Sequence, residues 1–138
     1  MFTDLIAIES AINKFGSQYF TAADINIVLS AVREKITTYE TYYIARTQEN
    51  NVVQLEISIL LDKVLYDFTL RPAGLTVTAV FLKHVSSVRE TYNNGTDYLR
   101  VDFFLANKSS IYYNIYGKEH VTRLIRYVGE VNTKIQNL

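Results

Sequence analysis

The chain has 138 residues, of which 14 are Lys or Arg and 14 are Asp or Glu, so its formal net charge is zero. A zero balance argues against a dedicated non-specific nucleic-acid binder, because such proteins usually carry a basic excess. The chain has no Cys, which excludes disulfides, thiolate metal sites and thiol redox chemistry. Its length and its hydrophobic content of 49% predict a single globular domain over residues 1–138.

The first residues do not resemble a signal peptide. They lack a basic segment, and Asp4 and Glu9 interrupt their apolar run. No apolar run approaches the ~20 residues that span a bilayer. We therefore expect a chain without a transmembrane segment, in the cytoplasm.

Residues 1–36 are expected to form a helical hairpin. Apolar residues at three- and four-residue steps predict a helix over residues 4–15, with Gly16 as its stop. Thr21 and Asp24 then have the spacing of a capping box, which predicts the start of a second helix.

Residues 37–116 are expected to form antiparallel strands. In residues 52–61 apolar and polar side chains alternate, which predicts a strand with one buried face and one face in water. Similar patterns, separated by short polar turns, predict further strands over residues 37–47, 64–71, 75–81, 85–92, 98–105 and 111–116. The short links require antiparallel neighbours, because a parallel pair needs a long crossover.

Two local signals shape this strand series. The alternation breaks at residues 82–84, which predicts a bulge or bend that divides one long strand into two. The sequence Asn93-Asn94-Gly95 predicts a tight hairpin turn, because Asn and Gly tolerate a positive φ.

Residues 117–138 are expected to form an amphipathic helix that caps the strands, since apolar residues recur at helical spacing from Val121 to Ile135. The predicted fold class is therefore α+β. It consists of an antiparallel meander of about six to seven strands in a roll or barrel, an N-terminal helical hairpin and a C-terminal helix. A one-sidedly apolar meander of this length is expected to close or to pack against helices.

The strand patterns at residues 75–78, 81–88, 99–103 and 111–113, followed by the helix with Val121, Leu124, Ile125 and Val128, carry a resemblance. The region from Thr37 to Leu138 resembles the pleckstrin-homology-like superfold, which has seven strands in two sheets and a C-terminal helix. Two features depart from that pattern. The N-terminal helical hairpin is additional, and the loop at residues 48–51 lacks the basic residues that phosphoinositide-binding members place there. The resemblance therefore does not support phosphoinositide binding.

A rival architecture is a cone-shaped α+β fold similar to the nuclear-transport-factor-2-like group, with a sheet wrapped around helices. The two leading helices and the long strands suit this fold. The terminal helix, and the lack of a helix within the strand series, suit it less.

Tyrosine is unusually frequent, with 11 residues and no Trp. Adjacent Tyr residues on a strand point to opposite faces, so some must be exposed. We expect partial exposure at Tyr39, Tyr42, Tyr43, Tyr112 and Tyr116. The candidate interaction surface comprises Tyr39, Tyr42, Tyr112, Tyr116 and His84. The plainer interpretation is that Tyr is a good strand former whose ring packs while its hydroxyl reaches water.

The sequence contains no recognisable catalytic, cofactor or metal motif. Only two His residues occur, and their spacing matches no metal-binding pattern. His84 lies at the predicted bend, where a role as acid or base is one interpretation and a surface histidine is the plainer one. The carboxylates, among them Glu56, Asp67 and Asp102, occupy polar-face positions where cross-strand pairing with Arg is the ordinary expectation.

These observations favour a non-enzymatic interaction or regulatory module that binds a protein or peptide and can self-associate, without a cofactor. The alternative is a small-molecule-binding or enzymatic cone-shaped domain with a pocket between sheet and helices, using groups such as His84, Tyr66 or Asp67. A small inhibitor or immunity-type protein is a third option that the sequence neither supports nor excludes.

Overall fold

The computed structural model describes residues 5–93 and 97–138, which form two compact units, Met1–Ala79 and Val80–Leu138. The described residues form an α+β fold with seven strands in two antiparallel sheets and three α-helices. The α+β class and the antiparallel meander are thus confirmed, and the described strands form no closed barrel. Each unit is considered by itself below, and the assignment of one domain to residues 1–138 stays a prediction.

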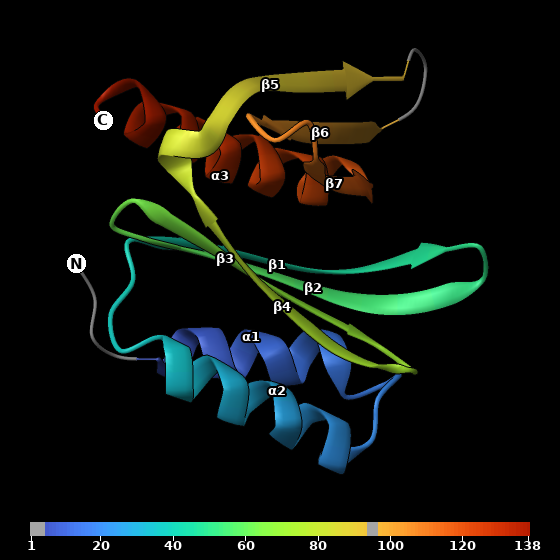
Figure 1. The fold of residues 1–138 in the computed structure, drawn as a ribbon. Helices are drawn as coiled ribbons and strands as arrows, with labels where there is room; N and C mark the ends of the chain where they lie inside the picture. Colours follow the sequence, from blue (N-terminus) through green and yellow to red (C-terminus); the bar gives the residue numbers. More distant parts are fainter. Residues whose placement is uncertain (1–4, 94–96) are drawn as a thin grey trace. The chain divides into compact units, whose positions relative to one another are not determined.

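The first unit begins with the helices α1 (Ile6–Gly16) and α2 (Ala22–Lys35), which lie on one face of its sheet (Figure 1). The capping box predicted for α2 is present: Asp24 N donates to Thr21 Oγ1, and Thr21 N donates to an Asp24 carboxylate oxygen. Across the helix pair, Arg33 donates a hydrogen bond to Glu9.

Gly16 has a different role from the predicted helix stop. It is the last residue of α1 and has no positive φ. A Cβ at this position would lie 2.6 Å from Ile25 Cδ1 and 3.2 Å from Leu55 Cδ2. The glycine therefore allows α1 to approach both α2 and the sheet closely.

The first sheet contains β1 (Thr41–Glu49), β2 (Val52–Leu61), β3 (Val64–Arg71) and β4 (Gly74–Phe81), in that order. Two-residue turns join these strands, and the turns after β1 and β2 use the positive φ values found at Asn50, Asn51 and Asp62. β1 begins four residues later than predicted, because the chain first leaves α2 through an extended C-cap at Ile36.

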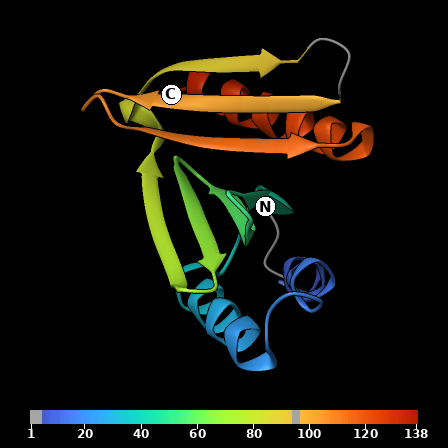
Figure 2. The same cartoon turned by 90° about the vertical axis from the view of Figure 1, so that its right-hand side faces the viewer.

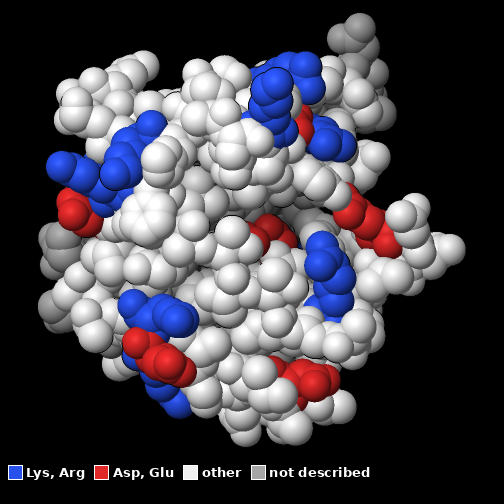
Figure 3. Space-filling model, viewed as in Figure 1, with Lys and Arg blue, Asp and Glu red and all other residues white. Residues whose placement is uncertain are grey.

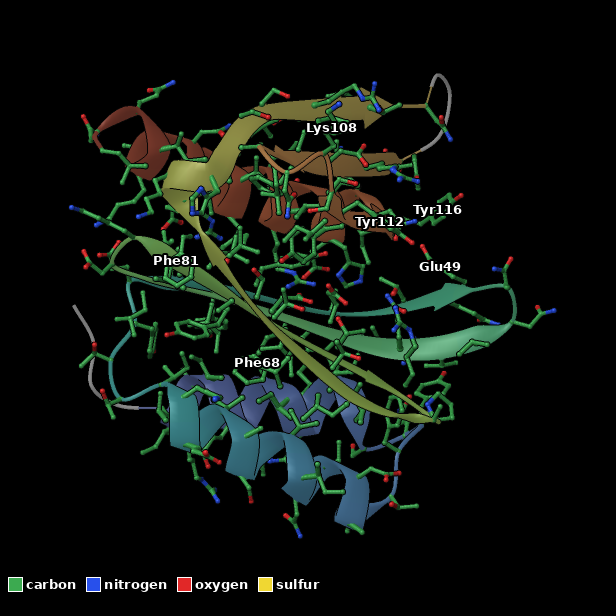
Figure 4. The ribbon with its side chains drawn as sticks, in the orientation of Figure 1. Glu49, Phe68, Phe81, Lys108, Tyr112 and Tyr116 are labelled. Atoms are coloured by element: carbon green, nitrogen blue, oxygen red, sulfur yellow. The ribbon has the colours of Figure 1, made fainter. Side chains whose placement is uncertain are left out.

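The core of the first unit lies between the sheet and the two helices. Phe68 of β3 is fully buried there, and Figure 4 shows it between the sheet and the helices of this unit. The buried apolar residues around it are Ile8, Ile12, Val28, Val32, Ile36, Ile44, Leu55, Ile57 and Ile59. The apolar positions of the predicted helical and strand patterns thus meet in one core.

The other face of β2 is not the wet face that its alternation predicts. Gln54, Glu56 and Ser58 are 8%, 7% and 0% exposed. β2 is a central strand, with Glu56 between Ala45 of β1 and Thr69 of β3. Side chains of the two flanking strands therefore border its polar residues, which the alternation of a single strand does not reveal.

The second unit contains a three-stranded sheet of β5 (Val85–Tyr92), β6 (Tyr98–Leu105) and β7 (Ser110–Tyr116) (Figure 2). A short 3₁₀ turn, Leu82–His84, separates β4 from β5, which confirms the predicted bend. A shift in the β5–β6 register between Val85 and Ser87 follows this turn. The predicted turn at Asn93-Asn94-Gly95 includes residues 94–96, which lie outside the described residues.

The helix α3 (Lys118–Gln136) lies against one face of this sheet (Figure 2). Of its predicted apolar stripe, Leu124, Val128 and Val131 are buried, whereas Ile125 is 42% exposed. Tyr127 is buried although the predicted stripe did not include it. The buried residues of the sheet are Leu99, Val101, Phe103, Tyr113 and Ile115. Among the described residues, no helix combines the length and apolar character needed to cross a membrane.

Candidate interaction surface

The strands β6 and β7 present a second face, which alternation directs away from α3. Tyr98, Arg100 and Asp102 of β6 occupy this face with Tyr112 and Tyr116 of β7. We call these five residues the Tyr–Arg face. Its members are held by contacts within the second unit.

Arg100 is the centre of the Tyr–Arg face. Its Nε lies 3.2 Å from both carboxylate oxygens of Asp102, and its Nη2 lies 3.1 Å from Oδ1. Its guanidinium carbon also lies 4.1 Å from the ring centroid of Tyr112, which is a cation–π contact. The hydrogen bonds to Asp102 raise the pKa of Arg100 above its ordinary value.

The Tyr rings extend this face along β7. The ring centroids of Tyr98 and Tyr116 are 4.6 Å apart. Tyr116 remains 66% exposed and Tyr112 37% exposed, and Figure 4 labels both on β7. The side chain of Arg100 is 42% exposed, whereas that of Asp102 is 5% exposed. The face therefore offers aromatic rings and a positive group to solvent and keeps its carboxylate covered.

β5 continues the surface on the other side of β6. Arg89 lies opposite Asp102 in the register, as expected for a cross-strand pair. The Asp102 carboxylate nevertheless accepts its hydrogen bonds from Arg100 on its own strand. The guanidinium of Arg89 instead lies 4.9 Å from the ring centroid of Phe104. A second Arg–aromatic contact thus borders the Tyr–Arg face.

The five residues of the predicted interaction surface divide between the units. Tyr112 and Tyr116 belong to the Tyr–Arg face. Tyr39 and Tyr42 lie in the first unit, where their rings make an edge-on contact with centroids 5.6 Å apart. His84 is exposed in the 3₁₀ turn, with its ring edge-on to Phe81 at 6.3 Å.

The expected exposure of Tyr39 and Tyr43 is wrong, because they are only 6% and 3% exposed. Tyr39 precedes β1 and belongs to the core between the sheet and the helices. Tyr42 is half-buried against the same core. Frequent Tyr thus reflects packing at Tyr39, Tyr43 and Tyr113 and exposure at Tyr112 and Tyr116.

A buried polar group in the first unit was not singled out by the sequence. Thr69 Oγ1 lies 2.9 Å from Glu56 Oε2 and 2.9 Å from Asp67 Oδ2. Burial and the neighbouring Asp67 raise the pKa of Glu56 to about 10. At the next position along the pair of strands, Arg71 Nε donates to Gln54 Oε1 at 3.0 Å. Within residues 5–93 and 97–138, no group of three or more His, Cys, Asp or Glu could hold a metal ion.

The zero net charge is divided unequally along the chain. Residues 1–79 hold six of the 14 basic and nine of the 14 acidic residues, so residues 80–138 hold the other eight and five. The two segments therefore carry formal charges of −3 and +3. On the face shown in Figure 3, basic and acidic side chains are interspersed, so the excess in residues 80–138 does not gather there in one basic patch.

No family model, curated protein or solved structure matches this chain. The candidate surface is therefore judged on its geometry and chemistry alone.

Proposed function

We propose that the chain is a non-enzymatic interaction module that binds a protein or peptide through the Tyr–Arg face. The observation that carries the proposal is the stacking of Arg100 on Tyr112 beside the exposed ring of Tyr116. Tyr and Arg are enriched in protein interfaces and among the residues that dominate binding energy. Asp102 and Tyr112 already fix Arg100, which lowers the entropy lost when a partner orders that side chain.

The partner is expected to present acidic side chains beside apolar or aromatic ones. Residues 80–138 carry an excess of three positive charges, and complementary charge accelerates association and selects partners. β7, which contains Tyr112 and Tyr116, ends the three-stranded sheet in its strand order, and an end strand is a template for an extended peptide. Self-association through the same strand remains within this proposal.

The test is selection of peptides from a random library displayed on phage, followed by affinity measurement on purified variants. Tyr112→Ala and Tyr116→Ala are each expected to weaken the selected peptides at least about tenfold, which corresponds to about 1.4 kcal/mol. Raised salt is expected to weaken binding further, because acidic peptides are attracted partly by charge.

Tyr92→Ala is the matched control, because Tyr92 is 53% exposed on β5 of the same unit and lies outside the Tyr–Arg face. It is expected to bind the selected peptides like the wild type. Equal urea midpoints for the three variants would show that they are folded. Unchanged affinity in Tyr112→Ala and Tyr116→Ala would contradict the proposal, as would a selection that enriches no peptide.

Two finer assignments belong to this proposal. The division of the strands into four and three, followed by a terminal helix, supports a pleckstrin-homology-like roll. An experimental structure in which the two sheets do not pack face to face would contradict it. A cytoplasmic location stays a prediction, which fractionation of cells with an antibody against the chain would check.

The alternative proposal is a small-molecule-binding or enzymatic domain. The observation that favours it is the buried group of Glu56, Asp67 and Thr69, because strongly shifted pKa values concentrate at functional sites. A screen in which no small molecule raises the melting temperature would count against it.

A further inference from the structure

The Thr69 hydroxyl contacts the carboxyl groups of both Glu56 and Asp67, and these two contacts need more hydrogen atoms than one hydroxyl supplies. The Thr69 hydroxyl lies 2.9 Å from one oxygen of each carboxyl group. A hydroxyl has one hydrogen to donate, whereas an ionised carboxylate only accepts. If both carboxyl groups were ionised, one of the two contacts would place lone pairs against lone pairs.

One proton on either carboxyl group makes both contacts hydrogen bonds. A protonated carboxyl group donates to Thr69 Oγ1, and the hydroxyl then donates to the other carboxylate. The two contacts of the Thr69 hydroxyl therefore call for one proton on the Glu56–Asp67 pair.

Arg71 is a cation that acts on Glu56, and its effect on the pKa is smaller than that of burial or of Asp67. The charged groups that act on Glu56 are Asp67 and Arg71, both on β3. Arg71 directs its Nε to Gln54, one step further along the strands. On β1 the residue opposite Glu56 is Ala45, and its neighbours on the same face are Tyr43 and Thr47.

Burial strengthens this requirement. Glu56 is 7% exposed and Thr69 is 6% exposed, and a buried carboxylate without a paired cation is costly. Burial is the largest cause that raises the pKa of Glu56 to about 10, and the charge of Asp67 adds to it. The hydrogen bond from Thr69 and the charge of Arg71 act in the opposite direction and are smaller.

We propose that Glu56 and Asp67 share one proton in the folded protein, and that loss of this proton weakens the β2–β3 pair. The first unit then contains a pH-sensitive element that no sequence motif marks. The proposal concerns Glu56, Asp67 and Thr69 and is independent of the partner assigned to the Tyr–Arg face.

The direction of the pH effect follows from proton linkage. The folded pKa of Glu56, about 10, lies above the ordinary value of 4.5. Between these values the folded chain holds a proton that the unfolded chain has lost. The stabilisation is complete below the ordinary pKa, and it is lost as pH rises through the folded pKa.

The first experiment measures urea unfolding midpoints of the full chain between about pH 5 and about pH 9. The wild-type midpoint is expected to fall as pH rises. Glu56→Gln is expected to flatten this dependence, because an amide cannot lose the proton, and to be more stable than the wild type at the alkaline end. Asp62→Asn is the matched control, since Asp62 is exposed in the β2–β3 turn, and it is expected to keep the wild-type slope.

The second experiment is made on the wild type, so it does not depend on whether a variant folds. Infrared spectroscopy of the wild type in heavy water at neutral pH is expected to show the carbonyl band of a protonated carboxyl group. Where Glu56→Gln folds, this band is expected to disappear. A wild type without the band would overturn the proposal, and so would a Glu56→Gln variant whose pH slope equals that of the wild type.

Discussion

Threonine hydroxyls perform three different tasks in this chain. Thr21 accepts a hydrogen bond from Asp24 N at the start of α2. Thr69 bridges two buried carboxyl groups. Thr133 donates to the carbonyl of Gly129 in the preceding turn of α3, which satisfies a group that the helix already pairs. The contribution of a threonine hydroxyl to the stability of the protein therefore differs between these three positions.

We predict that Thr21→Ala destabilises the protein by about 1 kcal/mol, because it removes the acceptor of the Asp24 backbone N–H at the start of α2. Thermal or urea unfolding measures the change. Thr133→Ala removes the same atoms from the last turn of α3, where Ala is the better helix former. We expect it to be neutral or slightly stabilising, and equal losses in both variants would refute the assignment of the cap.

Two glycines, one directly before α3 and one within it, affect the stability of the helix in opposite ways. Gly117 links β7 to α3 with a φ of 103°, and a Cβ there would lie 3.2 Å from His120 Cδ2. Gly129 lies within the helix, where a Cβ would have no neighbour within 4 Å. The first glycine is required by the backbone, whereas the second only weakens the helix.

Gly129→Ala is therefore expected to stabilise the protein by about 0.5–1 kcal/mol, since Ala loses less entropy in a helix. Gly117→Ala is expected to destabilise it, because a Cβ is strained at this φ. Urea unfolding of both variants measures the difference. A destabilised Gly129→Ala would mean that the exposed surface of α3 is more crowded than described.

Most elements were predictable because their signals are local. The capping box at Thr21 and Asp24 marked the start of α2, and the break in alternation marked the 3₁₀ turn at Leu82–His84. The burial of Gln54, Glu56 and Ser58 was not predictable from the alternation of β2. A pattern within one strand reports which residues share a face and not what covers that face.

The candidate sites were predictable only in part, for a related reason. Alternation marked Tyr112 and Tyr116 as members of one exposed face. The turn at Asp62-Lys63 also contained the signal for the buried carboxyl pair, because it sets Leu61 opposite Val64 and hence Glu56 opposite Thr69. The pairing of Arg100 with Asp102 and Tyr112 depends on side-chain conformations that spacing does not determine.

For the whole molecule, the sequence pI of about 6.7 assumes an ordinary carboxyl group at every acid. If Glu56 stays protonated when folded, the native protein carries one negative charge fewer near neutral pH. We predict that native isoelectric focusing gives a higher pI than focusing in urea.

Two variants make this prediction specific. Glu56→Gln is expected to leave the native pI unchanged and to raise the pI in urea, because its carboxyl group carries charge only when unfolded. Asp62→Asn removes an exposed carboxylate and is expected to raise the pI under both conditions. A native pI that rises equally in both variants would contradict the shared proton.

Every strand in both sheets pairs with a neighbour in the sequence, because the strand orders are β1-β2-β3-β4 and β5-β6-β7. The core of residues 1–79 likewise draws on α1, α2 and the first strands alone. During synthesis, when chains emerge from the N-terminus and domains fold as units, the first sheet has all its pairing partners before β5, which begins at Val85, leaves the ribosome. Short sequence separation between partners also favours fast folding. Consecutive pairing thus gives the nascent chain an assembly order that follows translation.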